Sequence, residues 1–111
     1  MVSIAQFRAL ALGLPKTEEH PHFEITSFRF NKKIFATLWE KDNKAMLKLS
    51  LVDQSVFCSF DKTVFYPVPN KWGTQGATFV ELSKVRKDML ADALTCAYQS
   101  VAEKKKKTTG R

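Results

Sequence analysis

The clearest pattern of apolar and polar positions lies between Thr26 and Leu51, where three short runs alternate with a period of two. Such alternation is typical of half-buried β-strands. The separators Asn31-Lys32 and Lys41-Asp42-Asn43 suit tight hairpin turns, because Asn and Asp tolerate left-handed backbone and bond to their own main chain. We therefore expect a three-stranded antiparallel meander, around which the rest of the chain is organised.

The two faces of this predicted meander differ in chemistry. Alternation gives one face to the apolar residues of a core: Phe28, Phe30, Ile34, Ala36, Leu38, Ala45, Leu47 and Leu49. The other face combines the cations of Arg29 and Lys48 with Phe35, Trp39 and Met46. Bases stack on rings and phosphates pair with cations, so this face suits a nucleic-acid platform. The alternative is that the rings form cross-strand pairs under a second layer of chain, with the charged tips reaching water.

Helices are expected at both ends of the chain. Ser3 and Gln6 have the spacing of a capping box, and Gly13 and Pro15 end this first helix, with Gly13 as a left-handed cap. Residues 16–24 look like a polar connector. The remaining predicted elements are a helix over 51–60, strands over 64–68 and 77–82, a loop over 69–76, and a long helix capped by Ser83. The pattern predicts an α+β two-layer sandwich, with a single antiparallel sheet of about five strands and the N- and C-terminal helices on one face.

Length and charge predict one domain over residues 1–103 and a basic disordered tail over 104–111. The chain has 111 residues and a formal net charge of +7. Five of its 18 basic residues are Lys104–Lys107 and Arg111, which leaves 13 basic against 11 acidic residues in the body. The tail can bind phosphates by counterion release, but it carries little sequence information.

Targeting signals and cysteine usage favour a cytoplasmic protein. The N-terminus lacks the basic-then-apolar pattern of a signal peptide, and no apolar run approaches the roughly 20 residues of a membrane span. Cys58 and Cys96 are far apart, each among apolar neighbours. We expect both thiols to be buried and reduced, and no membrane partner.

Catalytic and metal-binding motifs are nearly absent. Two histidines, His20 and His22, lie among Glu18, Glu19 and Glu24, which invites a metal site. However, Pro21 disturbs their alignment and no remote His could complete the ligand set, so we expect no metal or cofactor. The cysteines have no basic neighbour in sequence, and there is no Gly-rich phosphate loop or nucleophile elbow. The chain is expected not to be an enzyme, unless a cleft joins a cysteine to a histidine.

Two further segments could contact nucleic acid. Trp72 lies in a polar, Gly-flanked loop beside Asn70 and Lys71, where an exposed ring could meet a base. The alternative is that Trp72 folds back over the sheet edge as a lid on the core. Lys32 and Lys33 occupy the first hairpin turn, where they could touch a phosphate backbone.

Five short segments, in order and spacing, resemble the YjbR/MmcQ family of small bacterial proteins. These are Leu14-Pro15 before Glu18-Glu19, the stretch Ser27–Ala36, Leu47-Lys48-Leu49, Asn70-Lys71-Trp72 and Ala97-Tyr98. The resemblance covers the chain up to about Glu103. Asn31 and Lys32 stand where the family often has Gly, and no His precedes Trp72.

The resemblance implies a CyaY-like fold and a double-wing DNA-binding role, carried over by motif match to Lys33, Lys48 and Trp72. A CyaY-like fold also suggests iron binding, but the predicted first helix contains no acidic residue, so iron is disfavoured.

We therefore predict a non-enzymatic, monomeric, nucleic-acid (DNA)-binding protein. Its predicted contact residues are Arg29, Lys32, Lys33, Lys48, Lys71 and Trp72. The alternative is a protein-interaction or small-ligand module whose partner sits on the aromatic sheet face.

Overall fold

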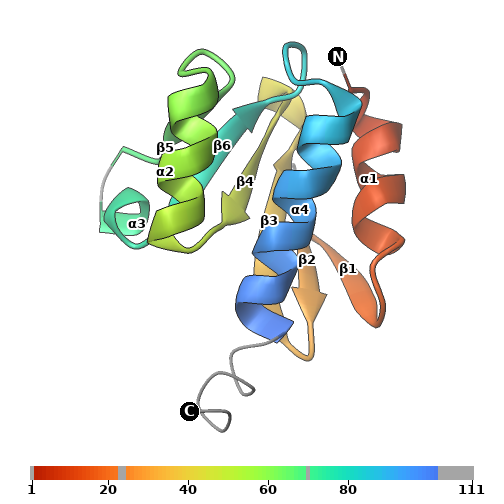
Figure 1. Cartoon of the computed structure of the whole chain (residues 1–111). Helices are drawn as coiled ribbons and strands as arrows, with labels where there is room; N and C mark the ends of the chain where they lie inside the picture. Colours follow the sequence, from red (N-terminus) through yellow and green to blue (C-terminus); the bar gives the residue numbers. More distant parts are fainter. Residues whose placement is uncertain (1, 23–24, 70, 103–111) are drawn as a thin grey trace, which may run out of the picture.

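The computed structural model describes residues 2–22, 25–69 and 71–102 (Figure 1). In chain order the elements are α1 (Ile4–Leu12), β1 (Thr17–His22), β2 (Ile25–Phe30), β3 (Lys33–Trp39), a 3-10 turn η1 (Glu40–Asp42), β4 (Lys44–Lys48), α2 (Leu51–Phe60), β5 (Phe65–Pro67), α3 (Lys71–Thr74), β6 (Ala77–Glu81) and α4 (Lys87–Ala102). None of the described helices is both long and apolar enough to cross a membrane.

The strands form one antiparallel sheet of six, in the order β1-β2-β3-β4-β6-β5. The predicted meander is confirmed as β2, β3 and β4, at the centre of this sheet. Its first turn places Asn31 and Lys32 in left-handed backbone, with φ of 51° and 70°. Its second turn is η1 followed by Asn43, also left-handed with φ of 52°. Both turns therefore use the residues that the sequence predicted for them.

Helices α1, α2 and α4 all lie on one side of the sheet, which confirms the predicted two-layer α+β arrangement (Figure 1). α4 packs across β2, β3 and β4 and also contacts α1. α2 covers β5, where the rings of Phe57 and Phe65 lie 5.1 Å apart. The core between the two layers includes the fully buried Phe7, Phe28, Leu47 and Leu90. Burial of this apolar layer is the main stabilising contribution to the fold.

Helix starts follow local capping rules. The Ser3 side chain accepts a hydrogen bond from the Gln6 main-chain N–H, and the Gln6 side chain accepts one from Ser3, so the predicted capping box is confirmed. Ser50 caps α2 in the same way by accepting from the Asp53 N–H. The predicted left-handed cap at Gly13 is wrong: its φ is −72°, and Lys16 adopts the positive φ instead.

The prediction of a polar connector over residues 16–24 is also wrong, because β1 pairs with β2 along its whole length. This strand lacks an apolar alternation, so its pairing depends on tertiary contacts. One such contact is a bidentate ion pair from Arg8 of α1 to Glu19, at 2.7 and 3.0 Å. The sheet consequently has one more strand than about five.

A β-bulge in β3 overturns the predicted facing of two residues. Phe28 pairs with Ala36 while Arg29 pairs with Ile34, so Phe35 is an extra residue in the ladder. Its ring turns into the helix layer, fully buried and 5.6 Å from the Tyr98 ring. Phe35 therefore lies in the core rather than on the mixed face, and Ile34 takes the opposite side from that predicted. A bulge changes the side on which successive residues emerge, which strict alternation does not anticipate.

The C-terminal part also departs from the prediction at two points. Ser83 does not cap α4; it lies in a turn in which the Lys84 and Val85 N–H groups donate to Glu81, and α4 begins at Lys87. The predicted loop over 69–76 contains the short helix α3. Asn70, the side chain of His22, Glu24 and the predicted tail at 104–111 lie outside the described residues.

Candidate functional site

The sheet face opposite α1, α2 and α4 carries a connected set of aromatic and aliphatic side chains. The ladder register brings Met46 beside Thr37 and Phe79, and the Trp39 ring lies 5.3 Å from the Phe79 ring at 87°. Tyr66 adds a third ring, 5.8 Å from Phe79. Trp39, Met46, Lys48 and Arg29 thus share the helix-free side, as predicted, whereas Phe35 does not.

One end of this face is closed by the chain's own contacts. The Lys44 Nζ lies 4.0 Å from the Phe79 ring centre and 5.6 Å from that of Trp39. The Tyr66 hydroxyl donates to Glu81, and burial together with this hydrogen bond raises the pKa of Tyr66 to about 12. Lys44 therefore covers one face of the Phe79 ring, and only the remaining surface of the Trp39 and Phe79 rings lines the cavity described next.

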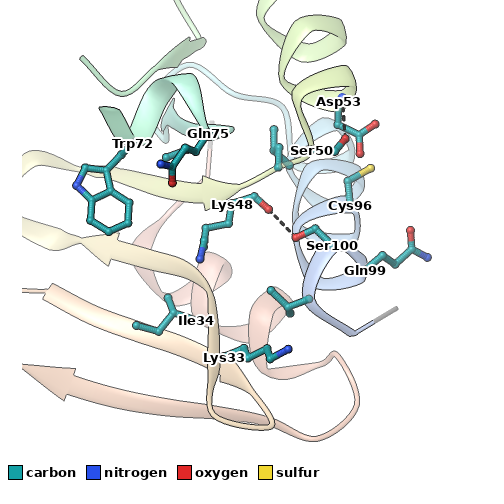
Figure 2. A pocket seen from close by; sticks show the side chains of 13 residues that line it. Lys33, Ile34, Lys48, Ser50, Asp53, Trp72, Gln75, Cys96, Gln99 and Ser100 are labelled. Atoms are coloured by element: carbon teal, nitrogen blue, oxygen red, sulfur yellow. Dashed lines mark hydrogen bonds between the residues drawn. The ribbon is translucent and has the colours of Figure 1, made fainter. Parts of the chain in front are cut away.

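The other end of the face opens into two adjoining cavities. The first, here called the sheet-face cavity, has a volume of about 570 Å³ and is lined by Ile25, Lys32, Ile34, Thr37, Trp39, Met46, Lys48, Val68, Trp72, Ala77 and Phe79. The second, the end cavity of about 700 Å³, lies where β3 and β4 meet the start of α2 and the last turns of α4 (Figure 2). Ile34, Lys48, Trp72 and Ala77 line both cavities, so we treat them as one groove.

Lysines border this groove. Lys32 lines the sheet-face cavity, Lys33 lines the end cavity, and Lys48 lines both. Figure 2 shows the side chains of Lys33 and Lys48 on facing sides of the end cavity. Among the described lining residues, Asp53 at the start of α2 is the acidic one. Three ammonium groups against one carboxylate give the groove a positive character that favours anions.

Trp72 lines both cavities and is 60% exposed, which agrees with the exposed ring rather than with the lid, the two alternatives that the sequence left open. The short helix α3, which carries Trp72, is held by a hydrogen bond from α2. The buried Gln54 side chain donates from Nε2 to the carbonyl oxygens of Gly73 and Ala77, at 2.9 and 3.1 Å. A Cβ at Gly73 would lie 1.9 Å from the Val68 oxygen, so only glycine fits there. The ring is therefore presented by a rigid support.

Lys48 is fixed from the helix layer. Its carbonyl oxygen accepts a hydrogen bond from the Ser100 hydroxyl of α4 at 2.8 Å, drawn as a dashed line in Figure 2. The next residue, Leu49, donates from its N–H to Gly76. These bonds anchor the end of β4 between α4 and the segment that follows α3. The main chain from which the Lys48 side chain projects is thus held in place.

The remaining two predicted contact residues lie outside the groove. Arg29 is on the same face, opposite Ile34 in the ladder, but it lines neither cavity and its Nε donates to the Ser27 hydroxyl at 3.1 Å. Lys71 is exposed at the first position of α3 and also lines neither cavity. The structure thus brings together Lys32, Lys33, Lys48 and Trp72 out of the six.

Several residues of the groove were not found from the sequence. Ile34 reaches it because of the bulge, which no local pattern signals. Gln75 comes from the turn that follows α3, whereas Gln99 and Ser100 come from the last turns of α4. Of these, Ser100 lies on the mostly apolar side of α4, three positions after the buried Ala97, which was an available signal. Phe79 lies on β6, whose pairing with β4 depends on the order of strands in the sheet and not on local sequence.

Among the described residues, the candidate nucleophiles and metal ligands are not assembled into a site. Cys96 lines the end cavity, but no histidine is among that cavity's described lining residues. Burial raises the pKa of the Cys96 thiol, Asp53 and Asp92 raise it further, and burial alone raises the pKa of Cys58. His20 is hydrogen-bonded to Glu18 at 3.1 Å on exposed β1. Within the described ranges, no three His, Cys, Asp or Glu side chains gather as metal ligands.

Comparisons with known proteins place the chain in a family. No curated protein matches it. Among solved structures, it is similar to the Deinococcus radiodurans protein DR2400, which contains a DUF419 domain. That similarity has a TM-score of 0.80 at 17% identity and covers 95% of this chain and 82% of the other, so it bears on the fold alone. The YjbR family model matches residues 12–100, a span that includes every described lining residue of the groove except Val101, and the chain therefore belongs to the YjbR family.

Proposed function

We propose that this protein is a non-enzymatic nucleic-acid-binding module that uses the groove as its binding surface. The observation that carries the proposal is that side chains from four different segments meet in one groove. A hairpin turn supplies Lys32, β3 supplies Lys33, β4 supplies Lys48 and α3 supplies Trp72, and all four side chains line one groove. Cations and an exposed ring on a shared concave surface are the parts that phosphate binding and base stacking require.

The energetics of such a site have two components. Each lysine that meets a phosphate releases condensed counterions, which makes affinity fall as salt rises. The ring of Trp72 and the apolar floor add stacking that depends little on salt. The Asp53 carboxylate, the acidic group among the described lining residues, lies at the start of α2, where it also stabilises the helix N-terminus.

The chemistry of the thiol among the described groove residues supports a binding role over a catalytic one. The groove thiol, Cys96, has a raised pKa and hydrogen-bonds to Asp53, so it is mostly protonated near neutral pH. A protonated thiol is a poor nucleophile, and the adjacent carboxylate would oppose its ionisation further. These properties support the proposal that the protein binds rather than converts its ligand.

The test is a fluorescence-anisotropy titration of labelled oligonucleotides with the full-length protein at two salt concentrations. We expect Lys33→Gln combined with Lys48→Gln to weaken binding roughly tenfold or more and to lower the salt slope by about two. Lys62→Gln, at an exposed position that lines neither cavity, is the matched control and should bind as wild type does.

A further variant separates the groove from the basic tail. Replacing Lys104–Lys107 by Gln removes four positive charges and leaves every described lining residue of the groove unchanged. Binding that survives this change and is lost in the groove variant supports the proposal. Binding that is lost with the tail charges and is unaffected by the groove substitutions shows that the groove does not bind nucleic acid.

The second candidate function is a small-ligand or protein-interaction module on the same face. The apolar lining and volume of the sheet-face cavity favour it, since ligand pockets usually span roughly 300–1,000 Å³. A small molecule that raises the melting temperature of a protein showing no groove-dependent oligonucleotide binding would identify this function.

A further inference from the structure

We infer that the groove is built for single-stranded nucleic acid, with one unpaired base inside the sheet-face cavity beside Trp72. The neighbouring phosphates would lie along Lys32, Lys33 and Lys48. This inference rests on the proposed function and specifies its ligand. It follows from the difference in chemistry between the two cavities and from the positions of the lysines around them.

The sheet-face cavity offers flat apolar surfaces and few groups that could read a base edge. Its walls are mainly Ile25, Ile34, Trp39, Met46, Val68, Trp72 and Phe79. The indole N–H of Trp39 donates to the Thr37 hydroxyl at 2.8 Å, so this polar group of the wall is already satisfied. A cavity of this kind accepts the face of a ring by stacking and dispersion. It therefore binds any base, with modest sequence preference.

A duplex cannot use such a cavity. Paired and stacked bases present only their edges in the grooves, and a base must leave the stack before its face can contact a protein. Extracting a base costs a few kcal/mol, whereas an unpaired base enters without that cost. Duplex binding here would consequently rely on the lysines and leave the apolar walls unused.

The lysines mark a path between the cavities. The left-handed backbone at Asn31 and Lys32 makes a compact hairpin turn, and the successive side chains of Lys32 and Lys33 reach different cavities. Lys48 lines both cavities at their junction. A strand whose base fills the sheet-face cavity would therefore pass its phosphates between these ammonium groups on the way to the end cavity.

The end cavity suits the continuation of that strand. Gln75, Gln99 and Ser100 line it with neutral hydrogen-bonding groups that fit sugar or base atoms (Figure 2). Asp53 lies at its α2 side, where its charge would repel a phosphate. The phosphates are thereby restricted to the side bordered by lysines, and the arrangement gives the strand a defined route.

The experiment compares three labelled ligands of equal length with the full-length protein: oligothymidine, a duplex, and an abasic single strand that keeps the phosphates. We expect oligothymidine to bind at least tenfold more tightly than either of the others. Trp72→Ala should weaken oligothymidine binding roughly tenfold, in the range found for one stacked base, and leave the abasic strand unaffected. The control is Phe60→Ala, whose ring on α2 is 62% exposed and lines neither cavity.

The outcomes separate this inference from the function on which it rests. If the duplex or the abasic strand binds as tightly as oligothymidine, and Lys33→Gln with Lys48→Gln weakens all three, the base-insertion inference is overturned and the groove remains a phosphate site. If the lysine substitutions change none of the affinities, both proposals fail. Quenching of tryptophan emission by oligothymidine, reduced in Trp72→Phe, provides an independent supporting readout.

Discussion

The buried amide of Gln54 donates to the main-chain oxygen of Gly73, nineteen positions later in the chain, and so ties α2 to the turn that presents Trp72. The same nitrogen also donates to Ala77 at the start of β6. One side chain thus holds a helix, a turn and a strand together directly beneath the groove. The position of the exposed Trp72 ring therefore depends on Gln54, which is buried and out of reach of a ligand. The residue that supports the site is thus a different one from the residues that would contact the ligand.

Gln54→Leu should loosen this support. Both oxygens keep a main-chain partner, since Gly76 donates to Gly73 and Val68 donates to Ala77, so each loses only its second hydrogen bond. We expect the free energy of unfolding to fall by about 1–2 kcal/mol, measured by urea denaturation, and oligonucleotide binding to weaken as well. The control Ser55→Ala, at an exposed position of α2, should change stability by less than about 0.5 kcal/mol. Equal stabilities for the two variants would contradict this role of Gln54.

Gly73→Ala tests the close approach below Trp72. The added Cβ would lie 1.9 Å from the Val68 oxygen, so main chain must move and the indole must shift with it. We expect a loss of stability of about 1–3 kcal/mol in urea denaturation and a change in tryptophan emission. At Gly13 the nearest atom to an added Cβ is 3.2 Å away and φ is −72°, so Gly13→Ala should cost much less than Gly73→Ala. A Gly73→Ala protein as stable as Gly13→Ala would show that the turn is not rigid.

The bulge predicts opposite consequences for two adjacent residues. Phe35 is fully buried against Tyr98, so Phe35→Ala should cost about 3–5 kcal/mol of unfolding free energy. Ile34 is half-buried and lines the groove, so Ile34→Ala should cost much less and instead weaken ligand binding. Chemical denaturation of both variants measures the first effect, and oligonucleotide titration measures the second. A larger stability loss for Ile34→Ala than for Phe35→Ala would contradict the bulge and indicate strict alternation along β3.

The thiol of Cys96 should respond to its acidic neighbour. Thiol reagents attack the thiolate, and burial and then Asp53 raise the pKa of Cys96, so labelling of the native protein at pH 8 should be slower than that of an unhindered thiol. Asp53→Asn removes one of the charges that oppose ionisation, so the pKa should fall toward its usual value and labelling should accelerate. Cys58, whose pKa is raised by burial alone, is the internal reference and should keep its rate. Faster labelling at both cysteines would indicate unfolding instead.

Short-range rules predicted the parts of the fold that short-range interactions determine. Asn31 and Asn43 occupy left-handed positions because their own side chains and turn geometry favour it, and Ser3 and Ser50 cap helices through bonds to residues three positions away. The two-layer arrangement followed from the pattern of strands between amphipathic helices. These features needed no knowledge of which strands lie side by side.

Longer-range interactions decided the rest. β1 is a strand because β2 offers a free ladder and Arg8 pairs with Glu19, although its own residues lack an apolar pattern. Phe35 left the predicted face because one extra residue in β3 changed its side. Of the six predicted contact residues, Arg29 and Lys71 were correctly expected to be near the sheet face and the Trp72 turn. Neither residue lines the groove, because its lining depends on how strands and helices distant in sequence pack together.

The order of the strands has a further consequence for how the molecule avoids self-association. The two edge strands, β1 and β5, contain Pro21 and Pro67 respectively. A proline has no amide hydrogen, so each edge lacks a donor that an incoming strand would need for a continuous ladder. Both margins therefore discourage edge-to-edge growth into aggregates, even in a sheet with an uncovered aromatic face.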